Sequence, residues 1–351
     1  MIPVTEPYLP PRGRLNHYLD RIHSSRRLTN NGPLVQELTE KLQDYLGVDN
    51  LLLVANGTLA LQVAYQTLNL TGSAVTTPFT FPATVGALKW TGVDPIYADV
   101  SKKTFNIDPG EINKVIKEDT TAMVAVHCYG NPCDVELLSE VAKKNHLRLI
   151  YDASHCFGVT YFGESILKWG DAATLSFHAT KLFSTVEGGA IVFRNKKDLE
   201  QARRLINFGI LEDGRLGDFG INAKMSEFHA AFGLACLPDV DKIIDYRLES
   251  IERYKDLLKD VVRFPVIRED TKWNGAYSCI ILESEDEALA VKKGLESNGI
   301  ESRRYFRPLI PDFDKYPLNS VLCLPLVHEM PSTCIESITN SVKKSLWLTR
   351  G

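Results

Sequence analysis

Apolar runs and segments with helical spacing alternate along the first half of the chain, and this alternation is the strongest constraint on its fold. Five apolar runs with the length of buried strands lie at residues 51–54, 74–77, 95–100, 122–128 and 147–151. Helical segments lie between them, at residues 59–69, 81–90, 108–116 and 135–144. Strands that alternate with helices form a mainly parallel sheet with helices on both faces. The order of the elements therefore predicts an α/β fold.

Polar residues follow several of the predicted strands. Gly57 and Thr58 come after the first strand, Asp152 comes after the strand at 147–151, and Lys181 comes after a further strand predicted at 173–178. Ligands of parallel sheets bind at the carboxyl ends of the strands. We therefore expect these residues to meet in one crevice.

Each of these residues also has a purely structural interpretation. Lys181 has apolar neighbours that would desolvate its amine, lower its pKa and make it a nucleophile; a surface lysine that closes a loop is the alternative. Gly57 and Thr58 at the start of a helix would bind a phosphate, or would serve only as a helix cap. Asp152 at the edge of the core needs a partner, and a structural salt bridge would supply one.

The combination of these residues indicates pyridoxal 5'-phosphate. A lysine can bond the aldehyde of this cofactor, and a carboxylate can keep its pyridine nitrogen protonated so that the ring accepts electrons. A helix N-terminus can hold the phosphate. Phe81, in the stretch Thr80-Phe81-Pro82, is placed to supply an aromatic face over the ring.

The composition argues against several other classes of protein. The chain has 351 residues and a formal net charge of −4, so the basic surface of a nucleic-acid-binding protein is not expected. No apolar run is long enough to span a bilayer, and the first residues do not resemble a signal peptide. Seven scattered cysteines without a C-x-x-C pair argue against zinc and against disulfides, so we expect a cytoplasmic protein without a metal.

The length and the pattern of elements predict more than one domain. A helical stretch predicted at 226–259 is broken near 237–239, and a strand at 277–282 and a helix at 285–298 follow it. We expect an N-terminal arm at 1–33, a large cofactor-binding domain at 34–237 and a small C-terminal α/β domain at 238–351.

Nine short motifs occur in the order known from one enzyme family. They are TNNGPLV at 29–35, NGTLAL at 56–61, FTFPAT at 79–84, VHCYGNP at 126–132, YDASH at 151–155, SFHATK at 176–181, EGG at 187–189, GINAKM at 220–225 and GIESR at 299–303. With them the chain resembles the DegT/DnrJ/EryC1/StrS family of sugar aminotransferases over nearly its whole length. The resemblance implies the type I pyridoxal-phosphate fold, like that of aspartate aminotransferase, with a seven-stranded sheet.

The resemblance also implies roles around the cofactor ring. Lys181 would form the Schiff base and then carry the proton of the 1,3-transfer. Asp152 would pair with the pyridine nitrogen, His155 would lie near the ring hydroxyl and Phe81 would stack on the ring. His178 is expected to be a buried, hydrogen-bonded side chain without a catalytic role.

The phosphate is expected to be held by both subunits of a homodimer. Gly57, Thr58 and Ser176 would bind it from one subunit, and Asn222 would reach the phosphate of the neighbouring subunit's cofactor. The chain departs from the family pattern at Lys224, where arginine is usual, and at Ile310, where histidine is common. Lysine keeps the charge of arginine but loses its forked geometry.

The activity implied is transfer of an amino group from L-glutamate to C4 of a nucleotide-linked 4-keto-6-deoxyhexose, with dTDP as the expected nucleotide. The product would be dTDP-4-amino-4,6-dideoxyglucose or its galacto epimer, for the O-antigen of lipopolysaccharide. Histidine at 155 tends to accompany C4 amination in the family, whereas glutamine accompanies C3 amination, which is the alternative.

Three other activities are less consistent with the sequence. The dehydratases of the family have histidine in place of the Schiff-base lysine, whereas Lys181 is present. A ligand-sensing regulator without turnover would not need the full set of Lys181, Asp152 and Thr58. A nicotinamide enzyme would have G-x-G-x-x-G after the first strand, and that motif does not follow residues 51–54.

Overall fold

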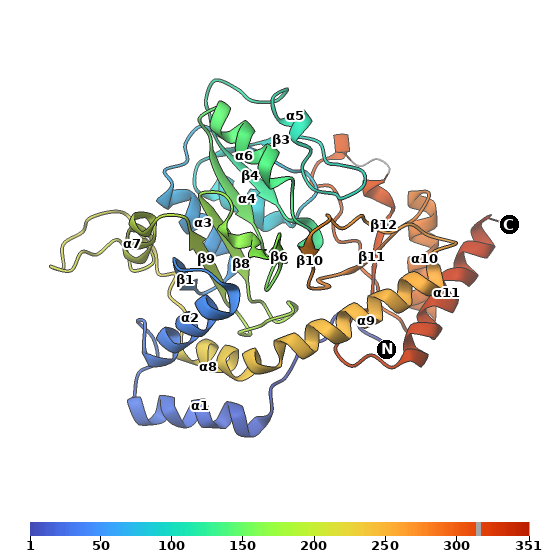
Figure 1. The fold of residues 1–351 in the computed structure, drawn as a ribbon, viewed down its shortest axis with the longest axis horizontal. Helices are drawn as coiled ribbons and strands as arrows, with labels where there is room; N and C mark the ends of the chain where they lie inside the picture. The colour runs from blue at the N-terminus through green and yellow to red at the C-terminus, as the bar shows by residue number, and fades with distance from the viewer. Residues whose placement is uncertain (314–316, 351) are drawn as a thin grey trace.

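The computed structural model describes residues 1–313 and 317–350, and a seven-stranded sheet forms its centre (Figure 1). The strands are β1 (Leu51–Val54), β2 (Ser73–Thr76), β3 (Asp94–Tyr97), β4 (Thr120–Val126), β5 (Arg148–Asp152), β8 (Ala172–Ser176) and β9 (Gly189–Phe193). Their order across the sheet is β1-β9-β8-β5-β4-β2-β3. In this sheet β9 alone runs against the other strands. The predicted α/β fold with a mainly parallel, seven-stranded sheet is confirmed.

Alternate residues of the strands contribute to two apolar clusters, one on each face of the sheet. In β1, Leu51 and Leu53 belong to one cluster, whereas Leu52 and Val54 belong to the other. One face is covered by α2 (Pro33–Leu46), α6 (Val135–Lys144) and α8 (Glu227–Cys236). The other face is covered by α3 (Gly57–Thr67), α4 (Pro82–Trp90) and α7 (Lys196–Leu205). Because both faces are covered, most strands are buried along nearly their whole length rather than alternating between buried and exposed residues.

The ends of several predicted elements differ from the observed ones. The helix predicted at 59–69 begins earlier, at Gly57, because the Asn56 side chain caps it by accepting a hydrogen bond from the Leu59 N–H at 2.9 Å. The helix predicted at 108–116 is reduced to α5 (Pro109–Ile112). The strand predicted at 173–178 ends at Ser176, where the chain turns toward Lys181.

The C-terminal part of the chain forms a third cluster around a second, two-stranded sheet. It comprises α9 (Val240–Leu258), β11 (Ser278–Ile281), α10 (Glu285–Ser297), β12 (Val321–Leu324) and α11 (Ser332–Arg350). The long helix α9 runs from beneath the central sheet to this cluster (Figure 1). The predicted break of the helical stretch is confirmed, since a 3-10 turn, η3 (Leu237–Asp239), joins α8 to α9.

The start of the chain packs against both parts. Ile2 forms a β-bridge with Ile300, while α1 (Arg12–Ser25) packs along α8 and its Arg14 forms an ion pair with Asp239, just beyond the end of α8. The division at residue 237 into two domains stays a prediction, and residues 314–316 and 351 of the expected C-terminal domain lie outside the described residues.

The remaining elements are short. They are β6 (Thr160–Tyr161), β7 (Glu164–Ser165), β10 (Thr271–Lys272), η1 (Cys128–Gly130), η2 (Ile166–Lys168), η4 (Pro311–Phe313) and η5 (Leu318–Ser320). Across residues 1–313 and 317–350, none of the helices combines the length and the apolar character needed to cross a membrane.

Candidate active site

A cleft with a volume of about 670 Å³ opens at the carboxyl ends of the parallel strands. It brings together seven of the eight predicted site residues, which are Gly57, Thr58, Phe81, Asp152, His155, Ser176 and Lys181. The eighth, Asn222, does not line it. The predicted convergence of Gly57, Thr58, Asp152 and Lys181 on one crevice is therefore confirmed.

Lys181 lies in the turn that follows β8, where its backbone N–H donates to the carbonyl of His178 at 2.8 Å. Desolvation lowers the pKa of the Lys181 amine from 10.5 to about 8, and the attraction of Asp152 only partly offsets this effect. A substantial share of this amine is therefore uncharged at mildly basic pH, as a nucleophile requires.

The N-terminus of α3 meets β8 at the floor of the cleft. Asn56 caps the N–H of Leu59, which leaves the N–H groups of Gly57 and Thr58 without an intrahelical acceptor. A Cβ atom on Gly57 would stand 2.9 Å from Cβ of Ser176, so only glycine lets the helix approach the strand this closely. Backbone donors and the Ser176 hydroxyl thus lie together in a compact corner whose donors suit an anion. The helix cap is supplied by the Asn56 side chain, and phosphate binding by Gly57 and Thr58 stays a prediction.

Asp152 ends β5 and receives hydrogen bonds at both carboxylate oxygens. Oδ1 accepts from the N–H of Ser154 at 3.1 Å and from its hydroxyl at 2.6 Å, and Oδ2 accepts from the Thr84 hydroxyl at 2.7 Å. Sequence reasoning missed Thr84 and Ser154. Both could have been predicted from the motifs, because Thr84 belongs to FTFPAT with Phe81 and Ser154 belongs to YDASH with Asp152 and His155.

His155 is buried against the aromatic wall of the cleft. Its ring stacks on Phe306 with a centroid distance of 5.8 Å and meets the edge of Tyr277 at 4.9 Å. Burial, with a smaller contribution from the charge of Lys181, holds the pKa of His155 well below its usual value. The imidazole is therefore neutral at physiological pH.

Aromatic residues from distant parts of the chain form the remaining walls. Phe81 lines the cleft at the start of α4 with 57% of its surface exposed, which leaves a ring face accessible. Tyr277, Tyr305 and Phe306 come from the C-terminal part and were not predicted. The Asn274 side chain fixes this wall by donating to the carbonyl of His155 at 2.8 Å.

The prediction for His178 is wrong in one respect, because the side chain is exposed rather than buried. It lines the cleft with its Nε2 3.6 Å from the carboxylate of Glu187 and its Nδ1 2.9 Å from the Thr180 hydroxyl. The strand ends at Ser176, two residues earlier than expected, so residue 178 belongs to the turn and not to the packed strand.

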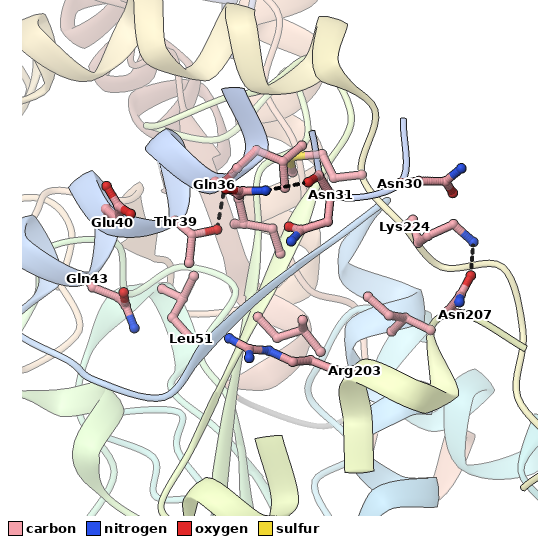
Figure 2. Close-up of a pocket in the computed structure, with 15 residues that line it drawn as sticks. Asn30, Asn31, Gln36, Thr39, Glu40, Gln43, Leu51, Arg203, Asn207 and Lys224 are labelled. Atoms are coloured by element: carbon pink, nitrogen blue, oxygen red, sulfur yellow. Dashed lines mark hydrogen bonds between the residues drawn. The ribbon is translucent and has the colours of Figure 1, made fainter. Parts of the chain in front are cut away.

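Asn222 is exposed and forms a backbone bridge with Asn207 outside the cleft. Close by, Lys224 donates to the Asn207 carboxamide at 3.0 Å and lies over the ring of Phe208 at 4.8 Å. Lys224 lines a second, separate groove of about 760 Å³ between α2, β1 and α7 (Figure 2). In Figure 2 the Asn31 turn and Gln36 form one side of this groove.

Comparison with known proteins agrees with this geometry. Residues 12–343 match the DegT/DnrJ/EryC1/StrS aminotransferase family. The dTDP-4-amino-4,6-dideoxy-D-glucose transaminase of Shigella dysenteriae is 40% identical, over 97% of this chain and 98% of that protein. The Escherichia coli protein of the same name is 36% identical, over 96% of this chain and 97% of that one. The crystal structure of DesI in the presence of its TDP-sugar product superposes with a TM-score of 0.92 at 31% identity, covering 98% of this chain and 93% of DesI. The chain belongs to the DegT/DnrJ/EryC1/StrS aminotransferase family.

Proposed function

We propose that this protein is a pyridoxal-phosphate-dependent aminotransferase that moves an amino group from L-glutamate to C4 of a dTDP-linked 4-keto-6-deoxyhexose. The meeting of Lys181, Asp152 and the N-terminus of α3 in one cleft is the observation that carries the proposal. Two relatives that span nearly the whole chain are named as transaminases for a dTDP-linked 4-amino sugar, which supports the choice of nucleotide and carbon.

The residues of the cleft fit the three functional groups of pyridoxal phosphate. The N–H groups of Gly57 and Thr58 and the Ser176 hydroxyl are donors suited to the phosphate, and the missing side chain at Gly57 leaves room for it. Asp152 is the carboxylate suited to a protonated pyridine nitrogen, and Lys181 is the amine suited to the aldehyde. Phe81 offers the aromatic face.

When bound, the cofactor supplies the aldehyde that holds amino groups and the ring that delocalises the electron pair freed from carbon. Lys181 then serves as the base that moves a proton, because its pKa of about 8 matches the working pH of such a group. Asp152 supplies a fixed negative charge opposite Lys181. His155, which is neutral, can donate one hydrogen bond without adding charge.

A second copy of this chain completes the site in this proposal. Loop 208–220 projects away from the body of the subunit (Figure 1), and it carries Leu216 and Phe219 with 60% and 88% of their surfaces exposed. Large exposed apolar side chains of this kind favour a protein partner. Asn222 follows this loop directly, so a homodimer would place it against the partner's phosphate corner.

C4 amination is favoured over C3 by His155 and by the names of the two relatives. Use of the product in O-antigen synthesis and a cytoplasmic location stay predictions.

The test is an assay of the purified protein with L-glutamate and dTDP-, UDP- and GDP-linked 4-keto-6-deoxyhexoses, with the product identified by NMR. We expect a yellow protein, covalent attachment of the cofactor to Lys181 after borohydride reduction, and a dTDP-linked 4-amino sugar. Lys181→Ala is the control for attachment. Amination at C3, or label on Lys181→Ala equal to that on the wild type, would contradict the proposal.

A further inference from the structure

Thr84 connects the aromatic wall of the cleft to Asp152. It is the third residue of α4, and its backbone N–H donates to the carbonyl of Phe81 at 3.2 Å. Its hydroxyl donates to Oδ2 of Asp152 at 2.7 Å, and both side chains are buried. One helical turn therefore fixes Phe81 in the cleft and places a hydroxyl against the carboxylate.

The hydrogens of this network can be assigned. An ionised carboxylate only accepts hydrogen bonds, so the single hydroxyl hydrogen of Thr84 points to Asp152. The Thr80 hydroxyl, which is 2.8 Å from that of Thr84, must then donate to Thr84. Thr80 and Thr84 are both buried, so water does not compete for these bonds. The result is a one-way chain from Thr80 through Thr84 to Asp152.

The two carboxylate oxygens of Asp152 accept hydrogen bonds from different kinds of donor. Oδ1 has two donors from Ser154, one of which is a backbone N–H that remains when the Ser154 side chain is replaced by alanine. Oδ2 has the Thr84 hydroxyl as its donor from the protein within the part of the chain that the structure describes. Loss of the Thr84 hydroxyl therefore leaves a buried carboxylate oxygen without a protein donor.

We propose that Thr84 is a positioning residue, which holds the Asp152 carboxylate in one orientation toward the pyridine nitrogen of the cofactor. The inference rests on the proposed function, since it requires pyridoxal phosphate in this cleft. Loss of the Thr84 donor would leave a buried carboxylate oxygen unsatisfied and free to turn, which costs free energy and loosens the alignment of Asp152 with the ring nitrogen. Thr84 thus acts on the cofactor through Asp152.

The test measures the dissociation constant of pyridoxal phosphate for the apo protein by equilibrium dialysis. Thr84→Val replaces the hydroxyl by a methyl group of the same shape. We expect it to weaken binding on the order of tenfold, the loss typical of one hydrogen bond to a buried polar group. Thr84→Ser keeps the hydroxyl and should bind as the wild type does. Ser154→Ala, which keeps the backbone donor to Oδ1, should show a smaller loss than Thr84→Val.

Thermal unfolding of each variant shows whether it is folded. If Thr84→Val does not fold, Thr84→Ala compared with Thr84→Ser isolates the hydroxyl in the same way. Wild-type affinity in the variants without a hydroxyl, or a loss in Thr84→Ser equal to that in Thr84→Val, would overturn the inference while leaving the proposed function intact. A wild-type protein that binds no pyridoxal phosphate would overturn both.

Discussion

The carboxylate of Glu227 lies directly against Gly32, so that a Cβ atom on residue 32 would stand 2.6 Å from its Cδ. Glu227 is completely buried. Its two oxygens accept hydrogen bonds from the backbone N–H groups of Leu34 and Val35, each at 2.9 Å. A side chain of α8 therefore caps the start of α2, and glycine at 32 leaves the space for it.

Replacing Glu227 should destabilise the protein strongly. Glu227→Ala leaves two buried N–H groups without acceptors and creates a cavity, which should lower the free energy of unfolding by about 3 kcal/mol. Glu227→Gln keeps one acceptor oxygen and should lose less. Urea unfolding of both variants measures the difference. Glu200→Ala, at an exposed ion pair with Arg203, is the control and should change stability by less than about 1 kcal/mol. Equal losses in Glu227→Ala and Glu200→Ala would contradict this account of the cap.

The relationship of Glu227 to Gly32 also marks the limit of what the sequence reveals. Spacing of apolar residues predicts α2 and the strands, because a helix and a strand each impose a period on the chain. It also places Gly57, Asp152 and Lys181 at strand ends, since parallel strands share one edge. A contact between residues 193 positions apart, like that of Glu227 with Leu34, follows no local period.

The candidate site likewise combines residues that the sequence predicts with residues that it does not. The motifs single out His155 and Phe81, but the wall of Tyr277 and Phe306 depends on how the C-terminal part docks on the sheet. No local pattern encodes that docking. Thr84 could have been predicted more easily, because residues three positions apart on a helix are neighbours and Thr84 is three positions after Phe81.

The amine of Lys181 should make the stability of the apo protein depend on pH. Its pKa is about 8 in the folded protein against 10.5 for an ordinary lysine, so between these values the unfolded chain holds more protons than the folded one. Stability therefore rises with pH across this window, and the full cost of burying the charge is present below about pH 8. Lys181→Met should therefore unfold at a higher urea concentration than the wild type at about pH 7. Its free energy of unfolding should be larger by at most about 3 kcal/mol. The advantage should shrink toward about pH 10.

Lys168→Met is the control for this measurement, because Lys168 is exposed and its replacement leaves the amine of Lys181 in place. Urea unfolding of the three apo proteins at the two pH values decides the question. An advantage of Lys181→Met that stays the same at both pH values would contradict the lowered pKa of Lys181.

The close approach of α3 to β8 should make Gly57 essential for cofactor affinity. A methyl group on residue 57 would press on Ser176 and push the N–H groups of α3 away from the phosphate corner. Gly57→Ala should therefore weaken pyridoxal phosphate binding by about tenfold or more, as expected for loss of a hydrogen bond to a charged group. Gly86→Ala in α4 is the matched control, since nothing lies within 4 Å of its Cβ position. It should leave the affinity unchanged and stabilise the helix slightly. Equal affinities of the two variants would show that this corner does not hold the phosphate.

Mixing two inactive variants should reveal whether the subunits share their sites. Lys181→Ala removes the amine from its own cleft, whereas Asn222→Ala removes a carboxamide that is exposed and lies outside the cleft of its own subunit. If Asn222 serves the partner's phosphate, a mixed dimer has one cleft with both defects and one with neither. Random exchange gives about half mixed dimers, so activity should recover to roughly a quarter of the wild-type level. Exchange is followed independently with a size tag on one variant. Proven exchange without recovery would place Asn222 outside the partner's site, because every mixed dimer then still lacks an intact cleft.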